Sequence, residues 1–211
     1  MQILAVIPAR GGSKAITHKN IIKLLGRPLL EYSIEQALQV GRLSKVVVST
    51  DDENIAEIAK RAGALVPFIR PLELATDEAQ SAPVIKHALE FMEKQTQYQF
   101  GAVLMLQPTT PLRKAEHINK AIDMFLDNQK ECDSVVSIVS VEGNHPFRMK
   151  RMIGNRLVSF IDQGFWDMSP RQSLPPVYIR NGAIYLNKRE VILDQNCLIG
   201  NHCMGYEMSP E

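Results

Sequence analysis

A glycine-containing segment near the N-terminus has the residue types that bind phosphate groups. It reads Arg10-Gly11-Gly12-Ser13-Lys14 and is followed by Lys19-Asn20. Glycines let backbone amides approach phosphate oxygens closely, and lysine and arginine neutralise their charge. Residues 1–30 contain five basic side chains and no carboxylate, which favours an anionic ligand over a loop with solvated charges. Neither GxxxxGKS/T nor GxGxxG is present, so the P-loop and dinucleotide fingerprints do not apply.

A second polar segment, residues 107–113, reads Gln-Pro-Thr-Thr-Pro-Leu-Arg and is stiffened by its two prolines. Gln107 and Thr109 offer uncharged hydrogen-bonding groups suited to a base or to sugar hydroxyls. A rigid turn in which Thr110 or a nearby residue caps the following helix explains the segment equally well. The residues alone leave both interpretations open.

Acidic residues precede two of the expected helices. Asp51 and Asp52 could hold a metal ion, but Thr50 and the glutamate three residues later fit a capping box, which favours helix initiation. Asp77 and Ser81 precede a later helix. They either cap that helix or face a nucleotide.

Candidates for binding a carboxylate or a further phosphate lie in the proline-containing segment 142–180. Arginine pairs with such anions through two parallel hydrogen bonds, and exposed charge is the ordinary alternative for each of them. The candidates are His145, Arg148, Arg171 and Arg180.

The composition is that of an ordinary globular chain, with 211 residues, 45% apolar and 22% charged, and a formal net charge of +1. A near-neutral chain is not expected to bind nucleic acid through a general basic surface. No apolar run approaches the roughly 20 residues that span a bilayer, and no positive region precedes the N-terminal apolar stretch, so we expect a cytoplasmic protein without membrane contact. Cys197, His202 and Cys203 lack the spacing of a zinc site, so we expect reduced thiols.

Apolar runs and helical periodicities alternate along the chain and predict the elements that position these residues. Strands are expected at Ile3–Ala9, Lys45–Ser49, Ala64–Phe68, Ala102–Leu106, Ser134–Val141 and Ala183–Leu186. Helices are expected at Leu29–Val40, Glu53–Gly63, Ala82–Lys94, Ala115–Asn128 and Lys188–Leu193. This alternation predicts an α/β fold, a three-layer Rossmann-like arrangement in which helices cover both faces of a mainly parallel sheet. Such sheets bind ligands beyond the carboxyl ends of their strands.

The alternation stops between about residues 142 and 180. This segment contains four prolines and the only tryptophan, Trp166, and it is too long for an ordinary loop. We expect a single domain, residues 1–211, with a β-rich excursion at about 142–180 that packs on a partner subunit.

Five motifs occur in order over nearly the whole chain. They are Ile-Pro-Ala-Arg-Gly-Gly-Ser-Lys at 7–14 with Lys19-Asn20, Val-Ser-Thr-Asp-Asp at 48–52, Leu-Ala-Thr-Asp at 74–77, Leu-Gln-Pro-Thr-Thr-Pro-Leu-Arg at 106–113 and Asn-Gly-Ala-Ile-Tyr at 181–185. In this order they resemble the motifs of the acylneuraminate cytidylyltransferases, or CMP-sialic acid synthetases, and of relatives acting on other nonulosonic acids. The first and fourth motifs are highly specific as a pair.

The resemblance implies a nucleotidyltransferase fold, a homodimer, and Mg²⁺-dependent transfer of CMP from CTP to the anomeric hydroxyl of a nine-carbon keto-sugar acid, with release of pyrophosphate. It implies that Arg10 and Lys19 carry out catalysis at the triphosphate. Nucleotide contacts are implied for Arg10, Gly11, Ser13, Lys19, Asn20 and Ser81. Sugar contacts are implied for Gln107, Thr109, Arg148 and Arg171.

The chain departs from the family pattern at two places. Arg180 is displaced by one position from the arginine of some members, which leaves its role open. The family's metal-binding Asp-x-Asp follows the strand around Tyr206, so we expect the metal ligands beyond Glu211 and none in this chain.

Two alternatives to this interpretation stay open. One is a nucleotidyltransferase of the same fold for another sugar or nucleotide, such as a deoxy-octulosonate or a GDP-forming relative. Thr109 disfavours the deoxy-octulosonate branch, whose members typically carry an acidic residue in that loop. The other is a non-catalytic nucleotide-binding module.

Overall fold

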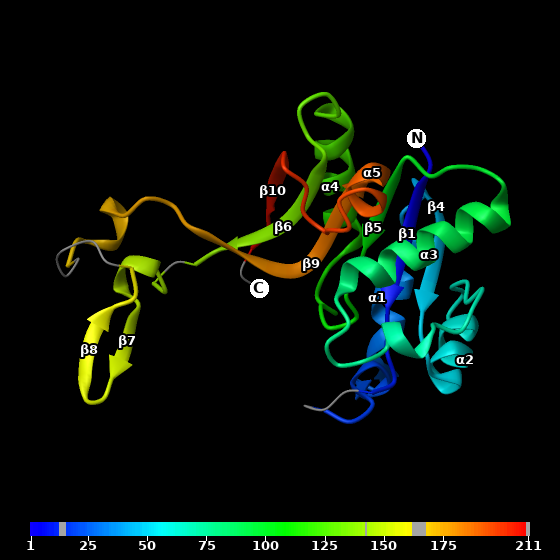
Figure 1. Ribbon diagram of the computed structural model, residues 1–211, viewed down its shortest axis with the longest axis horizontal. Coiled ribbons are helices and arrows are strands. Elements are labelled where there is room, and N and C mark those ends of the chain that lie inside the picture. Colours follow the sequence, from blue (N-terminus) through cyan, green and yellow to red (C-terminus); the bar gives the residue numbers. More distant parts are fainter. Residues whose placement is uncertain (13–15, 142, 162–167, 210–211) are drawn as a thin grey trace. The chain divides into compact units, whose positions relative to one another are not determined.

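The computed structural model describes residues 1–12, 16–141, 143–161 and 168–209 (Figure 1). Ser13 and Trp166 lie outside the described residues, and so does the side chain of Arg171. Within the described part, six strands form one sheet in the order β10-β6-β9-β5-β1-β4. The strands are β1 (Ile3–Pro8), β4 (Leu43–Ser49), β5 (Ala102–Met105), β6 (Ser134–Ser140), β9 (Tyr178–Lys188) and β10 (Cys203–Glu207).

The strand β1 lies between two parallel neighbours. It pairs with β4 on one side and with β5 on the other. Its apolar residues 3–7 are almost fully buried, because a parallel sheet covered on both faces exposes neither side of an inner strand. β9 pairs with β5 in the antiparallel sense, with Tyr185 opposite Met105. Gly182 and Ala183, which precede Tyr185 in β9, therefore lie at the carboxyl end of β5.

Helices pack on both faces of this sheet. They are α1 (Leu29–Leu38), α2 (Glu53–Arg61), α3 (Ser81–Thr96), α4 (Ala115–Asp127) and α5 (Arg189–Leu193). α1 contacts β1, β4 and α4, whereas α3 contacts β1, β5 and α5, so two helical layers enclose the sheet (Figure 1). The expected three-layer α/β fold with a mainly parallel sheet is confirmed.

Shorter elements join the main ones. The 3₁₀ helices are η1 (Lys19–Ile21), η2 (Leu72–Leu74), η3 (Pro146–Arg148) and η4 (Arg171–Ser173). Two small antiparallel pairs are β2 (Lys23–Leu24) with β3 (Arg27–Pro28), and β7 (Lys150–Ile153) with β8 (Arg156–Ser159). None of the described helices combines the length and apolar character needed to cross a membrane.

The chain is divided into two compact units. The first comprises Met1–Ser137 and Gly182–Tyr206, and the second comprises Ile138–Asn181 and Glu207–Glu211. The residues expected to form the β-rich excursion, about 142–180, belong to the second unit.

The strand expected at 64–68 is wrong. Only an isolated bridge between Leu65 and Val47 forms there. Pro67 has no N–H to donate, which prevents a regular ladder from continuing along this segment.

The capping box predicted at Thr50 is wrong, whereas the helix initiation expected from the Asp51–Asp52 pair is confirmed at Asp52. Asp52 is the N-cap of α2, and its Oδ1 accepts a hydrogen bond from the Ile55 N–H at 3.0 Å. Thr50 instead accepts a hydrogen bond from the Asp52 N–H through its Oγ1. The N-cap of α4 is Lys114, because the loop after β5 extends past Thr110 before the helix begins.

Candidate active site

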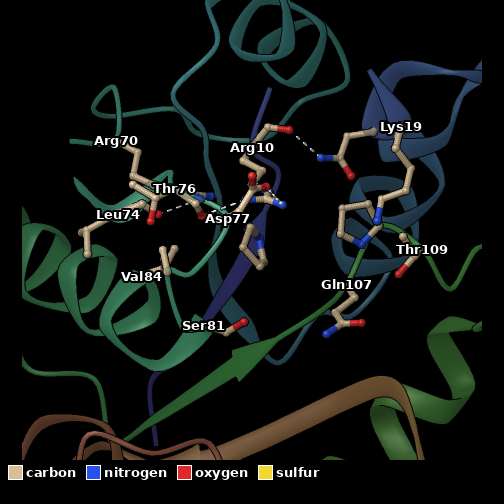
Figure 2. A pocket seen from close by; sticks show the side chains of 14 residues that line it. Arg10, Lys19, Arg70, Leu74, Thr76, Asp77, Ser81, Val84, Gln107 and Thr109 are labelled. Carbon is tan, nitrogen blue, oxygen red and sulfur yellow. Dashed lines mark hydrogen bonds and ion pairs between the residues drawn. The ribbon is translucent and has the colours of Figure 1, made fainter. Parts of the chain in front are cut away.

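A cavity of about 270 Å³ lies at the carboxyl ends of β1 and β5, entirely within the first unit. Its wall comes from the end of β1, η1, the segment before α3 and the loop after β5 (Figure 2). Seven residues that the sequence singles out line it: Arg10, Lys19, Asn20, Asp77, Ser81, Gln107 and Thr109. These residues are far apart in the chain, and the parallel strands bring them together because each follows or faces a strand end on the same side of the sheet.

Arg10 is held against one wall of the cavity. Its Nη2 forms an ion pair with Asp77 Oδ1 at 2.8 Å, and its Nη1 donates to the carbonyl oxygen of Thr76 at 2.7 Å (Figure 2). The Arg10 side chain remains 31% exposed, so the guanidinium can reach a ligand in the cavity. Asp77 therefore lines the cavity and does not cap α3, whose N-cap is Gln80.

Asn20 and Lys19 occupy the start of η1. Asn20 is buried and its Nδ2 donates to the carbonyl oxygen of Arg10 at 2.9 Å. This hydrogen bond fixes the backbone that carries Arg10. Lys19 lies beside Asn20 on the cavity wall and adds a second cation to it.

Gly11 supports the site without lining the cavity. Its N–H donates to Asp51 Oδ1 at 3.0 Å, and a Cβ at this position would lie 2.7 Å from Asp52 Oδ2. Only glycine fits so close to α2, so the carboxylates expected to start a helix also hold the glycine-containing segment in place. Ser13 lies outside the described residues.

Arg70 is a cavity residue that the sequence did not reveal. It is 4% exposed, and its Nε donates to Ser49 Oγ at 3.0 Å. Its Nη2 donates to the Ser49 carbonyl oxygen, and its Nη1 lies 3.4 Å from the Leu74 carbonyl oxygen. Burial lowers the pKa of Arg70 to about 10. The sequence shows only that Arg70 follows an apolar run and directly precedes Pro71, which does not indicate a role in the cavity.

Gln107 and Thr109 line the cavity from the loop after β5, and Gln107 lies next to β9. The Gln107 side chain approaches Gly182 so closely that a Cβ there would lie 2.9 Å from Gln107 Oε1. Gly182 has φ +79°, a backbone conformation that only glycine adopts readily. Ser81, the first residue of α3, lines the same cavity.

The arginines of the proline-containing segment belong to the second unit. Arg148 Nη2 donates to the Ser169 carbonyl oxygen at 2.9 Å. Arg180 is exposed at the start of β9, and the side chain of Arg171 lies outside the described residues. His145 is buried, with its Nε2 3.1 Å from the Pro175 carbonyl oxygen and its Nδ1 accepting from the Phe147 N–H. His145 thus fixes the turn that carries Arg148.

The charges of the cavity suit an anionic ligand. Its described lining has three cations, Arg10, Lys19 and Arg70, against the single carboxylate of Asp77. Uncharged donors and acceptors on Ser81, Gln107 and Thr109 lie in the same cavity. Among the described residues, no group of three or more His, Cys, Asp or Glu side chains is placed to hold a metal ion.

Known proteins share this sequence pattern. A family model described as cytidylyltransferase matches residues 4–194. The pseudaminic acid cytidylyltransferase of Campylobacter jejuni is 36% identical over 203 residues, which cover 96% of this chain and 85% of that relative. The N-acylneuraminate cytidylyltransferase of Escherichia coli is 38% identical over 212 residues, which cover 100% of this chain and 48% of that relative. This chain therefore spans about half of that relative's length.

A solved structure shares the fold. It is a CMP:2-keto-3-deoxy-manno-octonic acid synthetase complexed with CTP, with a TM-score of 0.71 and 17% identity over 99% of this chain and 90% of that chain. At this identity, the likeness concerns the fold alone.

Proposed function

Since this chain belongs to the cytidylyltransferase family, we propose that it transfers CMP from CTP to the anomeric hydroxyl of a nonulosonic acid and releases pyrophosphate. The relatives named above act on pseudaminic and N-acylneuraminic acids, which are both nine-carbon keto-sugar acids. The observation that carries the proposal is the cavity at the carboxyl ends of β1 and β5, where cations and uncharged polar groups meet.

The reaction joins the anomeric oxygen to the α-phosphorus and breaks the bond from that phosphorus to the bridging oxygen of the β-phosphate. The hydroxyl loses its proton, and the electron pair of the broken bond leaves with pyrophosphate. Such a displacement depends on in-line positioning and charge neutralisation more than on a protein nucleophile. Arg10 and Lys19 would offset the charge that develops on the departing pyrophosphate. Gln107 and Thr109 would hold the sugar, and Ser81 would lie at the base.

The test is pyrophosphate release from CTP or GTP with a panel of acceptors: N-acetylneuraminate, pseudaminate and 3-deoxy-octulosonate. We expect release with CTP and at least one nine-carbon acceptor. Release with the eight-carbon acceptor alone, or with GTP alone, would assign the chain to the other sugar or nucleotide. Nucleotide binding without release for any acceptor would favour a non-catalytic module.

We also propose that the transfer requires Mg²⁺, as the resemblance to the acylneuraminate cytidylyltransferases implies. The carboxylates nearest the cavity are already bonded: Asp51 to Gly11, Asp52 to the first turn of α2, and Asp77 to Arg10. They do not form a metal-binding set, and we assign no step of the transfer to an ion held by these residues. Treatment with EDTA should abolish transfer and added Mg²⁺ should restore it, whereas transfer that persists in EDTA would refute the requirement.

We also propose that the second unit pairs two copies of the chain. In its hairpin region, Met152, Leu157 and Phe160 are 69%, 54% and 62% exposed. Met152 and Leu157 lie directly opposite each other on β7 and β8, so they share one face of the hairpin. Large apolar side chains that are exposed side by side on one face of a hairpin, as Met152 and Leu157 are, are typical of an interaction surface.

A further inference from the structure

The loop that carries Gln107 and Thr109 rests on a buried arginine that does not itself line the cavity. Arg113 is 2% exposed, and its Nη1 donates to the Ala183 carbonyl oxygen at 2.7 Å and to Thr110 Oγ1 at 2.8 Å. Its Nη2 donates to Ser33 Oγ at 2.8 Å. One guanidinium thus joins the loop after β5 to β9 and to α1.

Gln107 is the residue on which these contacts converge. Its carbonyl oxygen lies 3.4 Å from Arg113 Nη1 and accepts hydrogen bonds from Thr110 Oγ1 at 2.9 Å and from Ser33 Oγ at 3.3 Å. Its side chain is set against Gly182, which directly precedes the carbonyl group that Arg113 holds. Both the backbone and the side chain of Gln107 are therefore placed relative to β9.

The charge of Arg113 makes this arrangement costly for stability alone. No ion pair joins it to a carboxylate among the described residues, and its buried Nε has no hydrogen-bond partner there. Burial lowers the pKa of this guanidinium to about 9. Neutral acceptors offset only part of the cost of burying a cation that has no counter-charge, and apolar residues of similar volume generally serve a core better.

We propose that Arg113 is a positioning residue, which fixes the Gln107–Thr109 segment against α1 and β9 and so sets where the sugar acceptor lies relative to the nucleotide. The part of this inference that concerns the sugar acceptor rests on the proposed function. Lysine cannot replace Arg113, because a single ammonium group on a flexible stem lacks the planar fork that reaches Ala183 and Ser33 at once.

The test compares Arg113→Lys with Arg189→Lys. The side chain of Arg189 is 25% exposed and is bonded to Glu93 through Nε at 2.8 Å and Nη2 at 2.9 Å. It lies outside the cavity lining. In Arg113→Lys we expect the KM for the acceptor to rise about ten-fold or more while the KM for CTP changes less than about two-fold. Arg189→Lys should lower the unfolding temperature and leave the ratio of the acceptor KM to the CTP KM unchanged.

A readout independent of turnover is amide hydrogen exchange in residues 107–112, which should be about ten-fold faster in Arg113→Lys than in Arg189→Lys. Ser33→Ala, which removes one acceptor of the guanidinium, should shift the acceptor KM in the same direction and by less. Unchanged exchange, or equal rises in the two KM values, would overturn the positioning role. If exchange is faster but the unaltered protein releases no pyrophosphate with any acceptor, the proposed function is overturned. The conclusion that Arg113 holds the Gln107–Thr109 segment in place would still hold.

Discussion

The Arg10 guanidinium is paired with the Asp77 carboxylate, although the proposed reaction needs this cation to bind phosphate. At 2.8 Å the carboxylate competes directly with a triphosphate for the Arg10 guanidinium. We expect Asp77→Asn to lower the dissociation constant for CTP by about three- to ten-fold, since Arg10 would no longer have to leave a charged partner. Calorimetric titration with CTP measures this, and Glu78→Gln, an exposed neighbour, is the control. Weaker binding would instead mean that Asp77 holds Arg10 in its productive position.

Lys19 carries the prediction for the second cation of the cavity. Lys19→Ala should reduce kcat/KM for CTP by more than about ten-fold, because each factor of ten corresponds to ~1.4 kcal/mol of transition-state stabilisation. Lys23→Ala is the matched control, an exposed lysine of the same acid-free segment that does not line the cavity. Equal kinetics for the folded Lys19 variant and the control would remove Lys19 from the site.

At the residue level, the sequence reveals side chains that follow strand ends but not the contacts that hold them. Seven of the candidate residues line the cavity because the parallel strand order brings those ends together. Arg70 was missed because its role depends on Ser49 and Leu74, which fold back onto it. The bond from Arg113 to Ser33 joins residues on separate helical and loop segments, and no local pattern predicts it.

At the level of elements, β9 lies close to the loop after β5 at Gly182, and the need for glycine there can be tested. Gly182→Ala should cost about 1 kcal/mol for its positive φ and should also push Gln107 away, raising the acceptor KM. Gly26→Ala is the control, because Gly26 has φ +82° and a Cβ added there would meet no atom within 4 Å. Thermal unfolding and acceptor KM measured on both variants separate the two effects. The same acceptor KM in both would show that Gln107 does not depend on this contact.

Apolar periodicity predicted most of the elements, because strands and helices that bury a face must repeat apolar residues at fixed spacing. The strand expected at 64–68 was wrong because backbone hydrogen bonding, which Pro67 interrupts, is not visible in an apolar pattern. Helix starts were less well predicted for a similar reason. Thr50 and Asp52 are both acceptable caps by residue type, and the structure shows that α2 begins after Asp52, whose side chain accepts from the Ile55 N–H.

At the level of the whole molecule, the hairpin of the second unit carries the prediction about assembly. Leu157→Glu should convert a dimer into monomers at micromolar concentration, because it places a charge opposite Met152 on the exposed apolar face. Leu25→Glu is the control, since Leu25 is 91% exposed at the turn of the β2–β3 hairpin. Light scattering gives the mass of each variant. A monomeric unaltered protein, or a dimer that tolerates the Leu157 change, would contradict the proposed pairing.

The place of β9 between β5 and β6 matters while the protein is being made. A ribosome releases the chain from its N-terminus, so β1, β4 and β5 can pair long before Tyr178–Lys188 has been translated. Until then, β5 and β6 each present an unpaired edge, and such edges invite pairing with other nascent chains. Translation that stops before residue 178 should therefore leave a fragment that aggregates, and the newly made protein should be a client of chaperones until β9 closes the sheet.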